Sequence, residues 1–226
     1  MFSFTELADF FLPRNCVSCL EKLSGKEKYF CHSCSGKLIL TDNSFIQSEF
    51  NRKFSGDGII SKLLSLYIFE TDSPVQSIIH HLKYSKRFKA GIFLGEKIAE
   101  RFKNDLNGID IFIPVPLHPA KEAERGFNQS YFLARGIAQR LNKEIGKRVI
   151  KRVRNTKSQT MLSLDERAEN MRGAFVLSNP EIIRNKSVAM VDDVITTGST
   201  IKECAALLKQ NGARIIIAVS SAITNI

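Results

Sequence analysis

The sequence predicts an α/β fold, with a parallel sheet and helices on both of its faces, preceded by a small metal-binding module. From residue 61 onward, short apolar runs alternate with stretches of helical periodicity, which is typical of a parallel sheet. Before that point, four cysteines stand in two closely spaced pairs. A chain of 226 residues is long enough for one α/β domain and a small accessory module. We expect the module at residues 1–40, a connector of turn composition at 41–60 and the α/β domain at 61–226.

The elements of the α/β domain follow from apolar periodicity and from helix boundary signals. A proline near the start of one helix and an Asn-Gly pair after another are typical boundaries. The expected strands are Leu63–Phe69, Ile109–Val115, Arg148–Val153, Val188–Val191 and Arg214–Ser220, and the expected helices are Pro74–Tyr84, Phe88–Phe102, Gln129–Leu141 and Thr200–Gln210. Ligands of such a sheet bind beyond the carboxyl ends of its strands.

Four of the five cysteines form two Cys-x-x-Cys pairs, with 11 residues between the pairs. Each pair makes a turn that directs two thiolates at one ion, and two such turns complete a tetrahedron. A shell of four thiolates has no open position, so we expect a structural zinc ribbon rather than free thiols or a redox pair. The predicted ligands are Cys16, Cys19, Cys31 and Cys34.

The expected absence of a secretion signal favours a metal over disulfides in this module. The stretch Met1–Leu12 carries two acidic residues and has neither a basic start nor a small-residue cleavage site, so we expect no secretion signal. His32 lies inside the second cysteine turn and is interpreted as a bystander. Cys204, alone on an apolar helix face, is interpreted as a core residue.

The net charge of +10 is concentrated in the middle of the chain. Residues 61–186 hold 23 basic and 13 acidic side chains, a difference of +10, whereas the two flanking segments are neutral. Such a field attracts polyanions, either a diphosphate substrate or a nucleic acid backbone, although a solvated basic surface is an equally good interpretation. No apolar run approaches the roughly 18 residues that a membrane-spanning helix needs, so we expect no membrane span.

The segment Val188–Thr200, VAMVDDVITTGST, predicts a cradle for a phosphorylated ribose. Asp192 and Asp193 follow an apolar run, and the hydroxyl-rich turn TTGST leads into a helix. Backbone N–H groups at a helix N-terminus suit a dianionic phosphate. Two adjacent carboxylates can accept hydrogen bonds from vicinal ribose hydroxyls, directly or through Mg²⁺. We expect Gly198 to let the backbone approach the phosphate closely.

This segment resembles the motif by which type I phosphoribosyltransferases bind 5-phosphoribosyl diphosphate (PRPP). The resemblance implies that Asp192 and Asp193 bind the ribose hydroxyls. It also implies a 5-phosphate loop made by Ile195, Thr196, Thr197, Gly198, Ser199 and Thr200. Purine-salvage members commonly have a third acid where Thr196 stands, so a salvaged purine is a poor guess for the acceptor.

A wider resemblance covers nearly the whole chain. The stretch Ile113–Gln129, IPVPLHPAKEAERGFNQ, is similar to the signature of ComF family proteins, the competence-associated phosphoribosyltransferase-like proteins. The cysteine pairs, HHLKY at His80–Tyr84 and RNTKSQ at Arg154–Gln159 also fit that family, whereas Ser85-Lys86 departs from it where a glycine is expected. Further matching positions are Leu162, Arg167, Asn170 and Phe175. The resemblance implies a competence role, a cytoplasmic location and contact with single-stranded DNA and DNA-uptake proteins.

By the same resemblance, the loop after the strand at Ile109–Val115 holds the diphosphate through Lys121 and Arg125, unless these are a solvated basic loop. The long polar stretch from Arg154 to Asn170 corresponds to a loop that closes over PRPP. We assign Arg154 and Arg167 to the leaving diphosphate, with a simple linker as the alternative.

Some residues keep two interpretations at this point. His118 is better interpreted as a residue that caps backbone groups than as a catalytic one. Lys83 and Tyr84 either touch ribose or nucleic acid, or are a snorkelling lysine beside a packed tyrosine.

The function therefore has two candidate classes. One is an enzyme that binds PRPP with Mg²⁺ and transfers the phosphoribosyl group to an unidentified acceptor, because no acceptor signature is present. The other is a non-catalytic competence protein that senses PRPP or binds single-stranded DNA.

Overall fold

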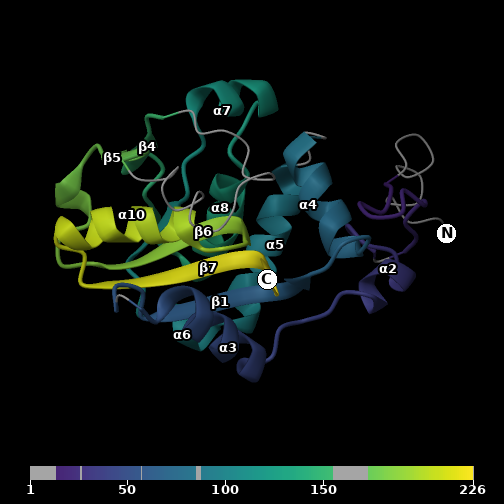
Figure 1. Cartoon of the computed structure of the whole chain (residues 1–226). Coiled ribbons are helices and arrows are strands. Elements are labelled where there is room, and N and C mark those ends of the chain that lie inside the picture. The colour runs from purple at the N-terminus through teal and green to yellow at the C-terminus, as the bar shows by residue number, and fades with distance from the viewer. Residues whose placement is uncertain (1–13, 26, 57, 85–87, 155–172, 226) are drawn as a thin grey trace.

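The computed structural model describes residues 14–25, 27–56, 58–84, 88–154 and 173–225 (Figure 1). Its centre is a sheet of five strands, all of them parallel, in the order β1-β7-β6-β2-β3. The strands are β1 (Lys62–Phe69), β7 (Ile215–Thr224), β6 (Ser187–Ile195), β2 (Ile111–Pro114) and β3 (Glu144–Ile145). This arrangement confirms the predicted parallel sheet, and its central strands β7 and β6 are longer than the sequence predicted.

Helices cover both faces of the sheet, as expected for strands that are apolar on both sides. On one face, α4 (Pro74–Tyr84), α5 (Phe88–Arg101) and α8 (Gln129–Leu141) share a hydrophobic cluster with alternate residues of the strands. On the other face, α10 (Ser199–Gln210) and the end of α3 (Asn43–Phe54) share a second cluster. Cys204 is fully buried in this second cluster, which confirms its interpretation as a core residue.

Short elements complete the fold. They are α2 (His32–Gly36), α6 (Lys103–Leu106), α7 (Pro119–Arg125), the 3-10 turn η2 (Pro180–Ile182), β4 (Ile150–Arg152) and β5 (Phe175–Leu177). The strand expected at Arg148–Val153 is present as β4. It pairs antiparallel with β5 in a separate two-stranded sheet rather than joining the main one.

The cysteine module packs directly on the α/β domain. Its apolar residues Val17, Leu23 and Phe30 belong to the same hydrophobic cluster as α4 and α5. The ring of Tyr29 lies 4.5 Å, centroid to centroid, from the ring of Phe93 on α5. The described part of the module is therefore anchored on the helices beside the sheet, while the domain limits at residues 40 and 60 stay predictions.

The expectation of a turn-rich connector at residues 41–60 is wrong for its central part, because residues 43–54 form helix α3. Asp42 caps this helix by accepting a hydrogen bond from the Phe45 N–H at 2.7 Å. Its last residue, Phe54, is completely buried under α10 and β1. The helix was missed because its apolar periodicity is weak and its fold depends on packing rather than on an amphipathic pattern.

Helix α3 adds a reason for glycine at position 198, while the predicted close approach to a phosphate stays a prediction. This residue has φ of +78°, and a Cβ atom placed on it would lie 2.7 Å from the ring of Phe54. Glycine is required here because the turn needs a left-handed backbone and because Phe54 fills the side-chain position. The turn into α10 is thus held from behind by α3.

None of the helices within the described residues is long and apolar enough to cross a bilayer.

The contact between Gly198 and Phe54 predicts a specific loss of stability. Gly198→Ala should lower the free energy of unfolding by on the order of 2–3 kcal/mol, since it adds both left-handed strain and a clash. Combining it with Phe54→Leu should remove the clash, so the two changes together should cost less than the sum of their separate effects. Urea unfolding measures each variant.

The control is Gly108→Ala, because the Cβ position of Gly108 faces open space. It should change stability by less than about 0.5 kcal/mol. A Gly198→Ala variant as stable as this control would contradict the assignment.

Candidate functional site

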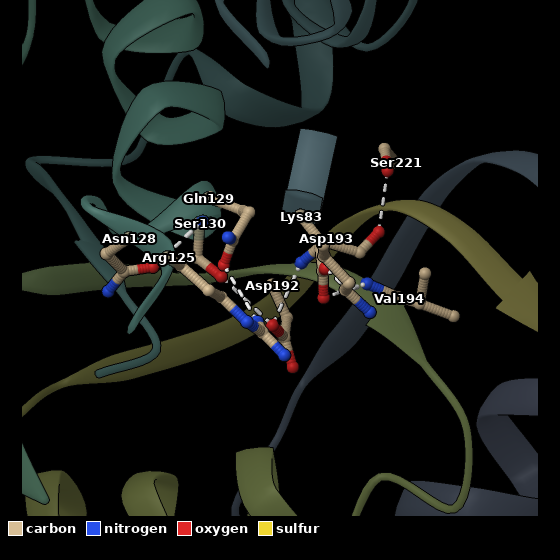
Figure 2. A network of polar contacts seen from close by, with 9 residues as sticks. All are labelled: Lys83, Arg125, Asn128, Gln129, Ser130, Asp192, Asp193, Val194 and Ser221. Carbon is tan, nitrogen blue, oxygen red and sulfur yellow. Dashed lines mark hydrogen bonds and ion pairs between the residues drawn. The ribbon is translucent and has the colours of Figure 1, made fainter. Parts of the chain in front are cut away.

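Two adjacent carboxylates lie at the C-terminal end of β6, in the middle of the sheet (Figure 2). The sequence analysis expected Asp192 and Asp193 to follow the strand. The strand instead continues to Ile195, so both aspartates belong to its last residues. In register, Asp192 is the partner of Ser220 on β7, while β2 pairs with the preceding part of β6. The acidic pair is therefore where an open α/β sheet places its ligands.

Lys83, at the end of α4, forms an ion pair with Asp193. Its Nζ lies 3.0 Å from Asp193 Oδ2, while Asp193 Oδ1 accepts a hydrogen bond from the Val194 N–H at 2.8 Å. Asp193 raises the pKa of Lys83 further above its ordinary value, so the amine stays charged. The ion pair places Lys83 at the acidic pair, while its predicted contact with ribose or nucleic acid stays a prediction.

Tyr84, the neighbour of Lys83, does not pack as predicted in the second interpretation. Its side chain is 58% exposed. The ring centroid lies 4.8 Å from that of His80, and the Arg125 guanidinium lies 5.7 Å from it. Tyr84 thus presents an aromatic ring beside the basic residues of the site.

Asp192 is held by two donors. The Ser130 hydroxyl donates to its Oδ1 at 3.0 Å, and the Asp193 N–H donates to the same oxygen at 2.9 Å. Burial, followed by the adjacent Asp193 carboxylate, raises the pKa of Asp192 from 3.8 to about 7. Both hydrogen bonds favour the ionised form of Asp192, so they offset part of this rise in its pKa.

Four basic side chains from three elements surround the acidic pair. They are Lys83 of α4, Lys121 and Arg125 of α7, and Arg152 of β4. The pKa of Lys121 is lowered by its burial and by the positive charges of Arg152, Arg125 and Lys83, and Glu124 partly opposes this shift, so the cations are close enough to interact electrostatically. Lys83, Lys121, Arg125 and Arg152 stand against Asp192, Asp193 and Glu124, which leaves a net positive charge that favours an anionic ligand.

The loop after β2 places two of these cations. His118 Nδ1 accepts a hydrogen bond from the Ala120 N–H at 3.2 Å and so caps α7, which confirms the capping interpretation. The Arg125 guanidinium donates to Gln129 Oε1 at 3.1 Å. Figure 2 shows Arg125 and Gln129 on the same side of the acidic pair as Ser130.

Asn128 and Ser130 are site residues to which the sequence analysis gave no role. Asn128 Nδ2 donates to the Val115 carbonyl at 2.9 Å, and its Oδ1 accepts from the Ser130 N–H at 3.0 Å. Asn128 thereby ties the end of β2 to the start of α8 and orients Ser130 toward Asp192. An asparagine before a periodic run is a capping signal, but the contact with Asp192 has no local signal.

The hydroxyl-rich turn leads into α10 as expected. The Thr197 and Ser199 hydroxyls lie 2.8 Å apart, and Gly198 stands at the N-cap position without a side-chain capping bond. Because its cap residue is a glycine, no side chain of that residue covers the N–H groups at the N-terminus of α10. Thr196 and Thr200, like Thr197 and Ser199, are partly accessible.

The residues predicted to act from the long polar stretch are only partly covered. Arg154 is exposed just beyond the end of β4. Arg167 and residues 155–172 lie outside the described residues, so their predicted role stays a prediction.

The four predicted metal ligands come together at the N-terminal module. The sulfur atoms of Cys16, Cys19, Cys31 and Cys34 lie within 4.8 Å of one another. Cys19 and Cys31 Sγ are 3.7 Å apart. Four sulfurs bound to zinc at about 2.3 Å stand about 3.8 Å apart, so the cluster fits a zinc ion.

Neighbouring groups also suit a thiolate cluster. Backbone N–H groups of Ser18 and Cys34 donate to the sulfurs of Cys16 and Cys31, each at 3.4 Å. Burial opposes ionisation of Cys16, but hydrogen bonds from the surrounding backbone lower its pKa to about 7, whereas burial and the neighbouring cysteine sulfurs raise the pKa values of Cys19 and Cys34. His32 is exposed, and its backbone N–H donates to Glu27, in keeping with a bystander.

The raised pKa of Asp192 predicts a pH-dependent stability. Between about pH 4 and pH 7 the folded protein binds a proton at Asp192 that the unfolded chain has released, so stability from this group is lost as the pH rises toward 7. Asp192→Asn should therefore become more stable relative to wild type, by about 1 kcal/mol or more, between about pH 5 and pH 8.

Urea unfolding of the two proteins across this range measures the effect, with the exposed Asp72→Asn as control. A difference between wild type and Asp192→Asn that is independent of pH would refute it.

Comparison with known proteins agrees with this geometry. Residues 128–223 match the family model of the phosphoribosyl transferase domain, a segment that includes the acidic pair and the turn. The DNA utilization protein YhgH of Escherichia coli (strain K12) is 35% identical over 145 residues, which are 62% of this chain and 63% of that protein. Competence protein F of Haemophilus influenzae is 32% identical over 146 residues, with the same coverage. The chain thus spans about 63% of the length of these relatives.

Competence protein ComFC of Streptococcus pneumoniae is 26% identical over 212 residues, 88% of this chain and 76% of that protein. Among solved structures, the glutamine PRPP amidotransferase of B. subtilis matches with a TM-score of 0.42 and 18% identity over 62% of this chain and 30% of that one. A hypoxanthine phosphoribosyltransferase of Staphylococcus aureus matches with a TM-score of 0.39 and 14% identity over 67% and 71%. The chain is therefore a relative of the YhgH protein and of the competence proteins F and ComFC over the stretches given, its residues 128–223 match a phosphoribosyl transferase domain, and its four-cysteine cluster fits a zinc ribbon.

Proposed function

We propose that the protein binds PRPP together with Mg²⁺ at the carboxyl ends of β6 and β2, and transfers the phosphoribosyl group to an acceptor. The observation that carries the proposal is the meeting of two adjacent carboxylates with four basic side chains beside a hydroxyl-rich turn. PRPP has the same distribution of groups, with a ribose diol between a monophosphate and a diphosphate. The site and the ligand are therefore complementary in charge along their length.

Each part of the site has a role in this proposal. Asp192 and Asp193 accept hydrogen bonds from the ribose hydroxyls, and the residues from Ile195 to Thr200 hold the 5-phosphate. Lys121 and Arg125 hold the diphosphate. Lys83 and Arg152 lie close to them and bind the same group. Asp193 then exchanges its ion pair with Lys83 for contacts to the ligand.

The transfer step is a displacement at C1 of the ribose. The bond from C1 to the diphosphate oxygen breaks as the acceptor nucleophile bonds to C1, and the negative charge passes to the diphosphate. Lys121, Arg125 and Arg152 stabilise that charge, and Arg154 and Arg167 are further candidates for the same role. Mg²⁺, when bound, supplies additional positive charge between the carboxylates and the diphosphate.

The names of the relatives support a role in DNA utilization and competence for the proposed activity. A second candidate is a protein that senses PRPP or binds single-stranded DNA without turnover, which the excess of basic residues around the site favours. Release of diphosphate from PRPP in the presence of candidate acceptors separates the two. Contact with DNA-uptake proteins and a cytoplasmic location stay predictions from the sequence.

We also propose that the four cysteines hold one structural zinc ion per chain. Support comes from the four sulfur atoms, which lie within 4.8 Å of one another, and from the backbone donors around them. Since this module packs on α5, the ion also stabilises the helices next to the sheet.

The PRPP proposal predicts that binding depends on both carboxylates and on a divalent cation. Asp192→Asn and Asp193→Asn should each weaken PRPP binding roughly tenfold to a hundredfold, because each removes a charged acceptor for the ribose hydroxyls. Lys83→Met should weaken binding as well. Calorimetry with millimolar Mg²⁺, and again without it, measures these effects.

The matched control for PRPP binding is Asp105→Asn, which removes an exposed carboxylate of the ion pair with Lys62. It should leave affinity unchanged. The proposal fails if wild-type protein binds neither PRPP nor ribose 5-phosphate, or if the Asp192→Asn/Asp193→Asn double variant binds PRPP as tightly as wild type.

The zinc proposal predicts about one zinc per chain in freshly purified, reduced protein. Cys16→Ser or Cys31→Ser should release the metal and lower the stability of the whole chain, because the module shares a core with α5. Metal analysis and thermal unfolding measure the two effects, and Cys204→Ala serves as a control that keeps the metal. Absence of zinc from the wild-type protein would sink this prediction.

A further inference from the structure

We propose that the cavity between the loop after β2 and strand β4 is a nucleotide-binding site that is separate from the acidic pair. The cavity has a volume of about 470 Å³, which is within the range of small-molecule sites. Its walls come from the end of β2, α7, α8, β4 and the residues next to them. Neither carboxylate of the acidic pair nor any residue of the turn into α10 lines it.

One wall of the cavity is apolar and suits a flat ring. Pro116, Leu117, Pro119 and Ile150 form it, together with Val153, whose side chain is 51% exposed. Ile150 is only 3% exposed, so Val153 is the residue whose exposed apolar surface a planar base would cover. This wall distinguishes the cavity from the acidic site, where polar and charged groups predominate.

Much of the rest of the lining is cationic. Lys147, Arg148, Lys151 and Arg152 line the cavity against a single acid, Glu122, so four cations face one carboxylate. The Lys147 ammonium also lies 4.6 Å from the centroid of the Tyr131 ring, another lining residue. A ligand that fits both parts of the lining joins a planar apolar group to an anion, which is the chemistry of a nucleotide.

A neighbouring hollow extends this surface. Lys147, Arg148 and Lys151 also line an adjoining depression of about 750 Å³. The three cations therefore stand at the shared rim of two hollows, where the phosphate of a nucleotide would lie with its base in the smaller one. Either a free mononucleotide or one residue of a single strand supplies this chemistry.

The cavity and the proposed PRPP site use different basic residues, and Arg152 is the one basic residue that they share. Arg152 lines the cavity and also interacts electrostatically with Asp192 and Lys121. Occupants of the two sites can therefore be distinguished by variants that change one site and leave the other.

The experiment titrates 2′-deoxyadenosine 5′-monophosphate into wild-type protein and three variants by calorimetry. Lys147→Glu/Lys151→Glu reverses two exposed charges of the cavity and should weaken binding at least about tenfold. Lys22→Glu/Lys37→Glu changes the net charge equally at exposed positions of the cysteine module and should bind as wild type does. Asp192→Asn/Asp193→Asn should also retain binding.

Three outcomes of this titration overturn the proposal. They are no binding to wild type, an equal loss in both lysine variants, and loss in the aspartate variant with retention in Lys147→Glu/Lys151→Glu. Inorganic phosphate tests the apolar wall, since an affinity equal to that of the nucleotide would also overturn the proposal. Displacement of the nucleotide by a single-stranded oligonucleotide would support the site with nucleic acid as the source of the ligand, and lack of displacement would support it with a free nucleotide.

Discussion

The adjacent carboxylates of Asp192 and Asp193 impose the constraint on which the arrangement of the site depends. Two like charges at the end of a buried strand are unfavourable unless positive charge and hydrogen-bond donors face them. Lys83 supplies the charge at 3.0 Å, and Ser130 supplies a hydroxyl. Helices α4 and α8 must therefore end and begin at the same edge of the sheet, and their packing on one face brings them there.

The turn that follows the carboxylates is held by a different part of the chain. Phe54 of α3 fills the position where a side chain of residue 198 would lie, so the start of α10 cannot move toward α3. The cysteine module plays a comparable part on the other face, where it shares a core with α4 and α5. Segments far from the site in sequence thus determine the positions of the turn and of Lys83.

Charge links the acidic site with its surroundings. Lys121 interacts electrostatically with Arg125, Arg152 and Lys83, and Arg152 also lines the neighbouring cavity. The excess charge noted for residues 61–186 is therefore gathered in part around two adjacent spaces instead of being spread over the surface. This arrangement suits ligands with several phosphates, in keeping with the family match of residues 128–223.

Local pattern determined the elements and the motifs, because periodicity, cysteine spacing and the DD…TTGST segment are properties of neighbouring residues. The helices at Pro74–Tyr84 and Gln129–Leu141 have the predicted bounds, and the four cysteines converge as their spacing indicated. Helix α3 was missed because packing, not its weak periodicity, stabilises it. The partners of Asp192 and Asp193, and the role of Gly198, were decided only by the tertiary structure. Those contacts join residues that are far apart in the sequence, with separations of 62, 110 and 144 positions. Only strand order and helix packing bring such residues together.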